Sequence, residues 1–187
     1  MLNNRRITSL ELAIIGLVHL EPTTGYDLCK RFESTPMGHF SSSPGAVYPA
    51  LRRLEKQGVI AGQVQRASSL RPRKVYSTTR DGKRLLTERV TAPVTDEDLM
   101  WDMEDLLLRF SFMGHVAGAT ETRRFLGDLA DKADARVREL ESHLRAMKAA
   151  GTPAGVLPTG RLALAYGTES YRGLARWARK ALKELDH

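Results

Sequence analysis

The stretch that decides the fold covers residues 43–58 and is SPGAVYPALRRLEKQG. Ser43 followed by Pro44 predicts a helix start, because serine is a favoured N-cap residue and proline suits the first helical position. Gly58 predicts the end of this helix. Its inner stripe carries Val47, Leu51 and Leu54. The other face carries Gly45, Tyr48, Arg52 and Lys56. The pattern therefore predicts a helix with one buried face and one polar, exposed face.

Two further helices are expected before this one. Residues 10–20 place apolar side chains at helical spacing on more than one face, which is typical of a helix covered on several sides. Thr24, with Asp27 three residues later, predicts the start of a second helix that ends near Glu33.

After Gly58 the pattern changes to short β-rich runs at residues 59–64 and 75–78, which flank the basic segment 66–74. These runs predict a hairpin with a basic tip. Thr78 and Asp81 have the spacing of a further helix start, and that helix is expected to end near Val90. Three helices followed by a two-stranded β wing predict a mainly α protein with a winged helix-turn-helix.

The second half of the chain predicts helices of a different kind. Pro93 opens a linker, and the acidic run at 96–105 is typical of a solvated helical start. Long helices are expected at 120–150 and 159–185, separated by the Gly- and Pro-rich residues 151–158. The last helix has two apolar flanks, which suit packing on a partner chain. We therefore expect a DNA-binding domain at 1–92 and a helical dimerisation domain, with a possible effector site, at 93–187.

Charge divides the chain at the same point. Residues 1–92 carry 15 Lys and Arg against 7 Asp and Glu, a net charge of +8, whereas residues 93–187 carry 14 against 15, a net charge of −1. Such a basic half favours a polyanionic partner, although a soluble domain that is merely basic would show the same balance.

The exposed side of the residue 43–58 helix and the wing are the expected contacts to double-stranded DNA. A helix that enters the major groove must be slim and polar on its outer side, and wing cations reach phosphates or the minor groove. The candidate DNA-binding residues are Ser43, Pro44, Gly45, Tyr48, Arg52, Arg71, Arg73 and Lys74. Two alternatives stay open: Tyr48 could be a core aromatic, and Arg52 or Arg53 could pair with Glu55 or Glu33.

Residues 8–90 resemble the PadR family of transcriptional regulators. The resemblance is carried by LELAIIGL (10–17), GYDL (25–28), SPGAVYPALRRL (43–54) and RPRKVY (71–76), followed by TRDG (79–82). The chain departs from the family pattern at Leu70, where a glycine commonly precedes the wing motif.

The resemblance implies a recognition helix from Ser43 onward, a wing at Arg71 to Lys74 that contacts operator DNA, and homodimerisation through the C-terminal helices. It also implies a repressor that a small molecule can release. The two recognition helices of a homodimer are expected to enter successive major grooves of a roughly palindromic operator. An aromatic or apolar effector could lie among Trp101, Phe110, Tyr166 and Trp177. The alternative is that these side chains only pack the dimer.

Other functional classes find little support in the sequence. The five histidines and the single Cys29 have no metal-ligand spacing, and no nucleophile, nucleotide or cofactor motif is present. We therefore expect no metal, no cofactor and no enzyme. The longest apolar run, Leu12–Val18, is too short to span a membrane. With one cysteine and no signal-peptide pattern, we expect a cytoplasmic protein. The competing hypothesis is a winged-helix module that binds an acidic protein.

Overall fold

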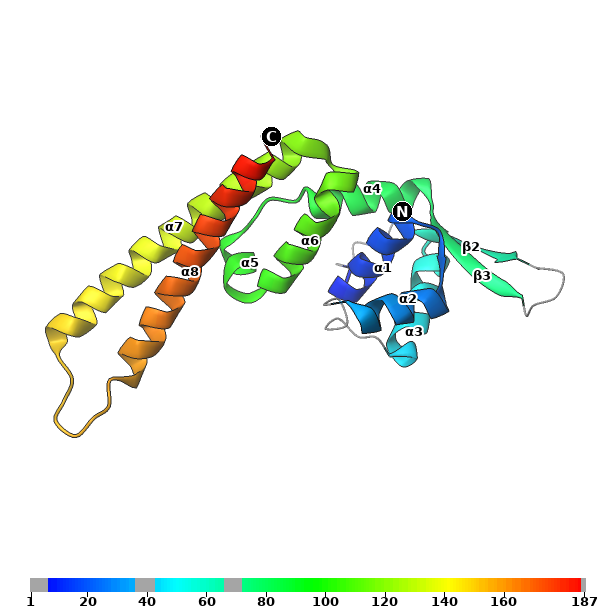
Figure 1. Cartoon of the computed structure of the whole chain (residues 1–187). Helices are drawn as coiled ribbons and strands as arrows, with labels where there is room; N and C mark the ends of the chain where they lie inside the picture. The colour runs from blue at the N-terminus through cyan, green and yellow to red at the C-terminus, as the bar shows by residue number, and fades with distance from the viewer. Residues whose placement is uncertain (1–6, 36–42, 66–71, 186–187) are drawn as a thin grey trace. The chain divides into compact units, whose positions relative to one another are not determined.

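The computed structural model describes residues 7–35, 43–65 and 72–185. The chain divides into two compact units, of which the first comprises Met1–Ala92 with Leu107–Ala117 and the second Pro93–Leu106 with Gly118–His187. Helices dominate both units (Figure 1). The predicted fold class, a winged helix-turn-helix followed by a helical domain, is confirmed. The sequence suggests one boundary after Ala92, whereas residues 107–117 return to the first unit.

Helix α1, Ser9–Leu20, is the core helix of the first unit. Thr8 caps it, because its hydroxyl accepts from the Glu11 backbone N–H while the Glu11 carboxylate accepts from the Thr8 N–H. Every residue from Glu11 to Val18 is buried. The prediction of a helix covered on more than one face is therefore confirmed.

Helices α2, Gly25–Ser34, and α3, Pro44–Lys56, begin where the sequence predicts. The Thr24 hydroxyl accepts from the Asp27 N–H at 3.2 Å, and Ser43 occupies the N-cap of α3. Gly58, which follows α3, has a φ of 72°, a left-handed conformation that favours glycine.

The sheet contains one strand more than the sequence predicts. Strands β2, Ile60–Gln65, and β3, Arg73–Thr78, pair antiparallel as the wing. Strand β1, Thr23–Thr24, pairs with the other edge of β3 and gives the order β1-β3-β2. A two-residue strand has no periodicity of its own, which is why the sequence does not reveal it.

Helix α4, Arg80–Val90, starts one residue later than predicted, because its N-cap is Thr79 and not Thr78. The Thr79 hydroxyl accepts from the Gly82 N–H at 3.0 Å and donates to the carbonyl oxygen of Gly58 at 2.6 Å. Thr78 is still a strand residue, paired with Ile60. The end of the wing therefore fixes the start of α4.

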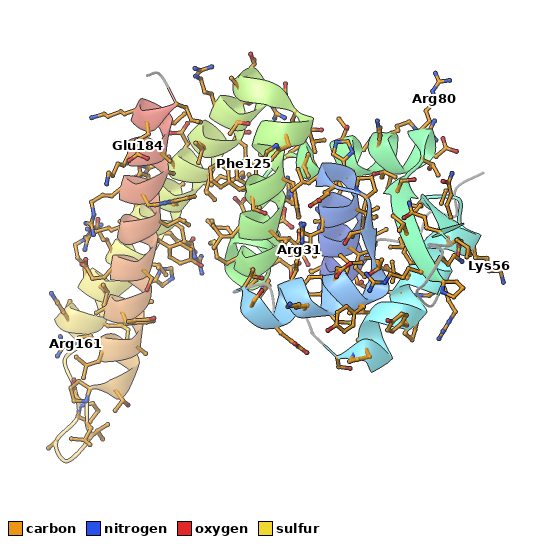
Figure 2. The ribbon with its side chains drawn as sticks, turned by 45° about the vertical axis from the view of Figure 1, so that its right-hand side comes forward. Arg31, Lys56, Arg80, Phe125, Arg161 and Glu184 are labelled. Carbon is orange, nitrogen blue, oxygen red and sulfur yellow. The ribbon has the colours of Figure 1, made fainter. Side chains whose placement is uncertain are left out.

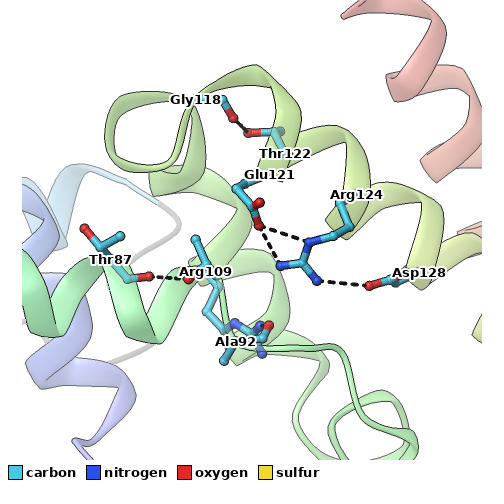
Figure 3. Close-up of polar contacts among 9 residues, drawn as sticks. Thr87, Ala92, Arg109, Gly118, Glu121, Thr122, Arg124 and Asp128 are labelled. Carbon is cyan, nitrogen blue, oxygen red and sulfur yellow. Dashed lines mark hydrogen bonds and ion pairs between the residues drawn. The ribbon is translucent and has the colours of Figure 1, made fainter.

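Helix α6, Met103–Val116, contributes its last turns to the first unit. A Cβ at Gly16 of α1 would lie 2.4 Å from the Phe112 ring, so the ring packs directly on that glycine. Arg109, only 1% exposed, donates a hydrogen bond from its guanidinium to the Ala92 carbonyl oxygen just beyond α4 (Figure 3). A cation at a helix C-terminus is favourably placed in the field of the helix dipole.

His19, in the last turn of α1, is a neutral group inside this packing. Its Nδ1 is buried and has no hydrogen-bond partner among the described residues. Burial lowers the pKa of His19, and the positive charges of Lys83 on α4 and His115 on α6 lower it further. The imidazole is therefore mainly uncharged at pH 7.

The second unit is built on the helical hairpin of α7, Gly118–Ala150, and α8, Thr159–Glu184, which pack along each other (Figures 1 and 2). Both long helices and the connection between them are close to the prediction. Arg172 pairs with Glu141 and Arg179 pairs with Asp134 across the hairpin. On the first turns of α7, Arg124 bridges Glu121 at 2.7 Å and Asp128 at 3.5 Å (Figure 3).

The acidic run is helical, as the sequence predicts, but one of its carboxylates is buried. It forms the short helix α5, Asp96–Trp101, and the start of α6, and Asp105 is only 6% exposed. Lys132 of α7 holds Asp96 at 2.7 Å, and α5 packs on α7. The expectation of a solvated helical start was therefore wrong for Asp105. None of the described helices is long and apolar enough to cross a membrane.

Candidate nucleic-acid interface

Helix α3 has the two faces that the sequence predicts. Val47, Ala50, Leu51 and Leu54 are buried, whereas the candidate residues Ser43, Pro44, Gly45, Tyr48 and Arg52 are exposed. Tyr48 is 39% exposed, so it is not a core aromatic. At the end of the helix the side chain of Lys56 extends away from the ribbon, as does that of Arg80 at the start of α4 (Figure 2).

A groove of about 520 Å³ lies within the first unit, between the start of α2, helix α3 and strand β3. Three candidate residues, Tyr48, Arg73 and Lys74, line it together. The remaining lining residues are Thr24, Gly25, Tyr26, Pro72 and Tyr76. The groove therefore combines aromatic rings with two cations, a combination that suits a sugar-phosphate backbone and base edges.

The other candidate residues lie elsewhere. Pro44, Gly45 and Arg52 of α3, and its N-cap Ser43, do not line the groove. Arg71 and its neighbour Leu70 lie outside the described residues, so the predicted wing tip contact has no structural description.

Tyr26 is a groove residue to which the sequence analysis gave no role. It is 69% exposed on the first turn of α2 and lines the groove with Tyr48. The signal was present in the quoted GYDL segment, because a tyrosine directly after the start of a helix, on its polar side, has no core to fill.

Glycine at position 25 makes the aromatic side of the groove possible. A Cβ at Gly25 would lie 2.7 Å from Cε1 of Tyr48, closer than packed atoms come, and in a tight contact of 3.1 Å with Leu51. The Tyr48 ring therefore rests on the backbone of α2, which restricts the positions open to its hydroxyl.

Lys74 is not a free cation. Its Nζ lies 2.7 Å from Oε2 of Glu55 on α3 and 5.4 Å from the centroid of the Tyr76 ring. The hydrogen bond to Glu55 raises the pKa of Lys74. Burial raises the pKa of Tyr76, which is 6% exposed beneath the lysine.

The arginine pair on α3 differs from the expectation. Arg53 pairs with the buried Glu11 of α1, Nε to Oε1 at 3.0 Å, and not with Glu55 or Glu33. Arg52 forms no ion pair with any described residue. The expected pairing with Glu55 or Glu33 was wrong because α3 packs on α1. This packing brings Arg53 to Glu11, which lies 42 residues earlier in the chain.

The candidate effector residues are dispersed over the two units. Trp101 is 78% and Tyr166 is 76% exposed, Trp177 is partly exposed on α8, and Phe110 is half-buried in the α6 segment of the first unit. None of them lines the groove or the two other described cavities. Among the described residues no three His, Cys, Asp or Glu side chains gather as a metal site. The effector site stays a prediction.

Three helices, a basic wing and an exposed outer face of the third helix define a winged helix-turn-helix domain. The model of the transcriptional regulator PadR-like family matches residues 14–88, which lie within this domain. The family is one of transcriptional regulators and not of enzymes.

Individual relatives are distant. The Escherichia coli transcriptional regulator YqjI is 28% identical over 89 residues, which are 44% of this chain and 43% of that protein. The Bacillus subtilis negative transcriptional regulator PadR is 21% identical over 144 residues, 77% of this chain and 78% of that protein. The alignment therefore spans less than half of the E. coli relative's length.

Solved structures of similar proteins include Bacillus subtilis PadR in complex with operator DNA, which is 22% identical. The match covers 95% of this chain and 99% of that one, with a TM-score of 0.42. A PadR-like regulator from Bacillus cereus is 24% identical over 98% of this chain and 99% of that one, also at 0.42. Such low TM-scores add nothing to the fold assignment, which rests on the helices and strands themselves.

Proposed function

We propose that this protein is a sequence-specific, DNA-binding transcriptional regulator that acts as a homodimer. The observation that carries the proposal is the groove in which Tyr48, Arg73 and Lys74 meet beside the exposed face of α3. The basic charge of residues 1–92 supports it, because cations that neutralise phosphates supply the affinity that all duplexes share. The location that we propose is the cytoplasm.

The proposed division of labour follows from chemistry. The outer residues of α3, from Ser43 to Arg52, contact base edges in the major groove, where the pattern of donors and acceptors identifies each base pair. Arg73 and the wing contact flanking phosphates, which orient the domain but carry no sequence information. Residues 1–92 supply these contacts, and residues 93–187 supply the dimer.

Repression and dimerisation are parts of the same proposal. The B. subtilis relative is named a negative regulator, which supports a repressor. The outer flank of α8 exposes Leu162, Tyr166, Trp177 and Leu185, and a second copy of the chain would cover these apolar side chains. A dimer places two recognition helices about 34 Å apart on a roughly palindromic operator. An aromatic or apolar effector that binds residues 93–187 would release the DNA.

The test is fluorescence anisotropy with a labelled duplex from the region upstream of the protein's own gene. A scrambled duplex of equal composition is the comparison, over a series of salt concentrations. The upstream duplex should bind more tightly, and both affinities should fall steeply with salt. Equal binding of the two duplexes contradicts a specific regulator, and no binding to either favours the protein-interaction module.

Variants separate the two kinds of contact. Arg73→Ala should weaken binding to both duplexes and reduce the salt slope by about one unit. Arg84→Ala is the matched control, since Arg84 is an exposed arginine of α4 already paired with Asp81 at 3.0 Å. Tyr48→Ala should reduce the preference for the upstream duplex. The same loss on both duplexes for Tyr48→Ala and Arg73→Ala would contradict the division of labour.

A further inference from the structure

The contact between Lys74 and Glu55 joins the wing to the recognition helix. Glu55 lies in the last turn of α3, where the negative end of the helix dipole disfavours a carboxylate. The Lys74 ammonium from β3 offsets this cost at 2.7 Å. The pair therefore has a local reason to form in the free protein.

Gly62 of β2 creates the path for this pair. It lies opposite Tyr76 in the β2–β3 register, and a Cβ there would be 2.2 Å from Cε of Lys74 and 2.8 Å from Oε1 of Glu55. The lysine side chain thus passes over a glycine to reach α3, and its ammonium lies 5.4 Å from the centroid of the Tyr76 ring. Three elements are shaped around one ion pair.

The pair is partly open to solvent, and its lysine lines the groove. The Lys74 side chain is 41% exposed and that of Glu55 is 30% exposed, and Lys74 lines the groove with Tyr48 and Arg73. Exposed pairs of this kind are weak, so a DNA phosphate can take the ammonium from the carboxylate. Once the ammonium has moved, the Glu55 carboxylate is left near the phosphate and repels it.

We propose that Glu55 is a positioning residue that competes with a DNA phosphate for Lys74 and thereby limits the affinity of the wing for any duplex. The inference rests on the proposed DNA-binding function. In the free protein Glu55 holds Lys74 against α3 and fixes the base of the wing. In the complex Lys74 leaves the Glu55 carboxylate and binds the phosphate. The loss of the ion pair reduces the binding free energy that the Lys74–phosphate contact contributes.

Glu55→Gln tests the competition, because it keeps the shape of the side chain and removes its charge. We expect the dissociation constant for the upstream duplex to tighten about three- to fivefold, which is the size of an exposed ion pair. The salt slope should become steeper by up to about 0.9. Glu88→Gln is the control, since Glu88 is an exposed carboxylate of α4 at 3.8 Å from Arg84 and the charge change is identical. It should alter affinity less than twofold.

The Lys74→Met background separates competition from a general effect of charge. If Glu55 acts through Lys74, Glu55→Gln gives no gain in that background. The inference is overturned if the gain in affinity persists in the Lys74→Met background or equals that of Glu88→Gln. It is also overturned if Glu55→Gln weakens binding. In each case the DNA binding of the wild-type protein is unaffected. A wild-type protein that binds no duplex overturns the proposed function and this inference together. Thermal melts of each variant verify that it is folded.

Discussion

Among the described glycines of the first unit, Gly82 should tolerate an added methyl group least. A Cβ there would lie 2.0 Å from the carbonyl oxygen of Val59 and 3.0 Å from its carbonyl carbon. Because the obstacle is backbone and not a flexible side chain, α4 or the start of the wing has to move. Gly82→Ala should therefore destabilise the protein although alanine is the better helix former.

The magnitude follows from the bonds at this junction. The Val59 carbonyl accepts from the Thr79 N–H and from the Thr79 hydroxyl, each at 3.1 Å. Losing both costs about 1 kcal/mol each. Forcing an extra carbon into packed structure costs about 1–3 kcal/mol. Alanine returns about 1 kcal/mol through helix propensity. The net destabilisation is about 3 kcal/mol, which lowers Tm by about 6–12 °C in a chain of this size.

Thermal denaturation followed by circular dichroism measures this shift. Gly114→Ala is the matched control, because Gly114 lies in the α6 segment of the same unit and a Cβ there meets nothing within 4 Å. The two substitutions restrict the unfolded chain equally, so their difference reports the folded state. Gly114→Ala should be neutral or stabilising. If the Gly82→Ala protein had the same Tm as the Gly114→Ala protein, the reasoning would be refuted.

Three more predictions concern charge and surface. Arg53→Gln leaves the buried Glu11 carboxylate without the Arg53 guanidinium and should lower the free energy of unfolding by about 1–3 kcal/mol in urea denaturation. Arg52→Gln should change it by less than about 0.5 kcal/mol. Equal losses for the two variants would contradict this. The pKa of His19 is lowered from 6.5, so the unfolded chain takes up the proton first: stability is full above pH 6.5 and declines as pH falls toward the lower folded value. Tm should therefore drop more between pH 7 and pH 5 in wild type than in His19→Gln, and parallel curves would exclude His19 as the cause. Tyr166→Asp should dissociate the proposed dimer in light scattering after gel filtration, and a retained dimer would remove this face of α8 from the interface.

The parts of the fold that sequence predicts are those with local causes. The start of α3 follows from Ser43 and Pro44, and its two faces follow from the helical period. Strand β1 was missed because Thr23 and Thr24 become a strand only by pairing with β3. Thr78 and Thr79 have the same capping chemistry, so the sequence alone does not choose between them. Thr79 caps α4 because its hydroxyl also bonds to the carbonyl oxygens of Gly58 and Val59, between α3 and β2.

The candidate site divides in the same way. Residue types on the outer face of α3 were predictable, since helix geometry alone exposes them. The partners of its charges were not, because Glu55 is 19 residues from Lys74 and Glu11 is 42 residues from Arg53. Whether two such side chains meet depends on how β3 and α1 pack against α3, and sequence spacing has no information about that.

These ion pairs determine which cations of residues 1–92 are available to bind a phosphate. Arg53 is committed to Glu11 and Lys74 to Glu55, whereas Arg52, Lys56 and Arg73 form no ion pair with any described residue. A phosphate gains most from a cation that has no carboxylate to give up, because no existing contact has to be broken. The count of 15 Lys and Arg in residues 1–92 therefore overstates the number of cations that are ready to bind a phosphate. Among the described cations of this face, Lys56 and Arg73 should therefore contribute more to the salt dependence of DNA binding than Arg53 and Lys74.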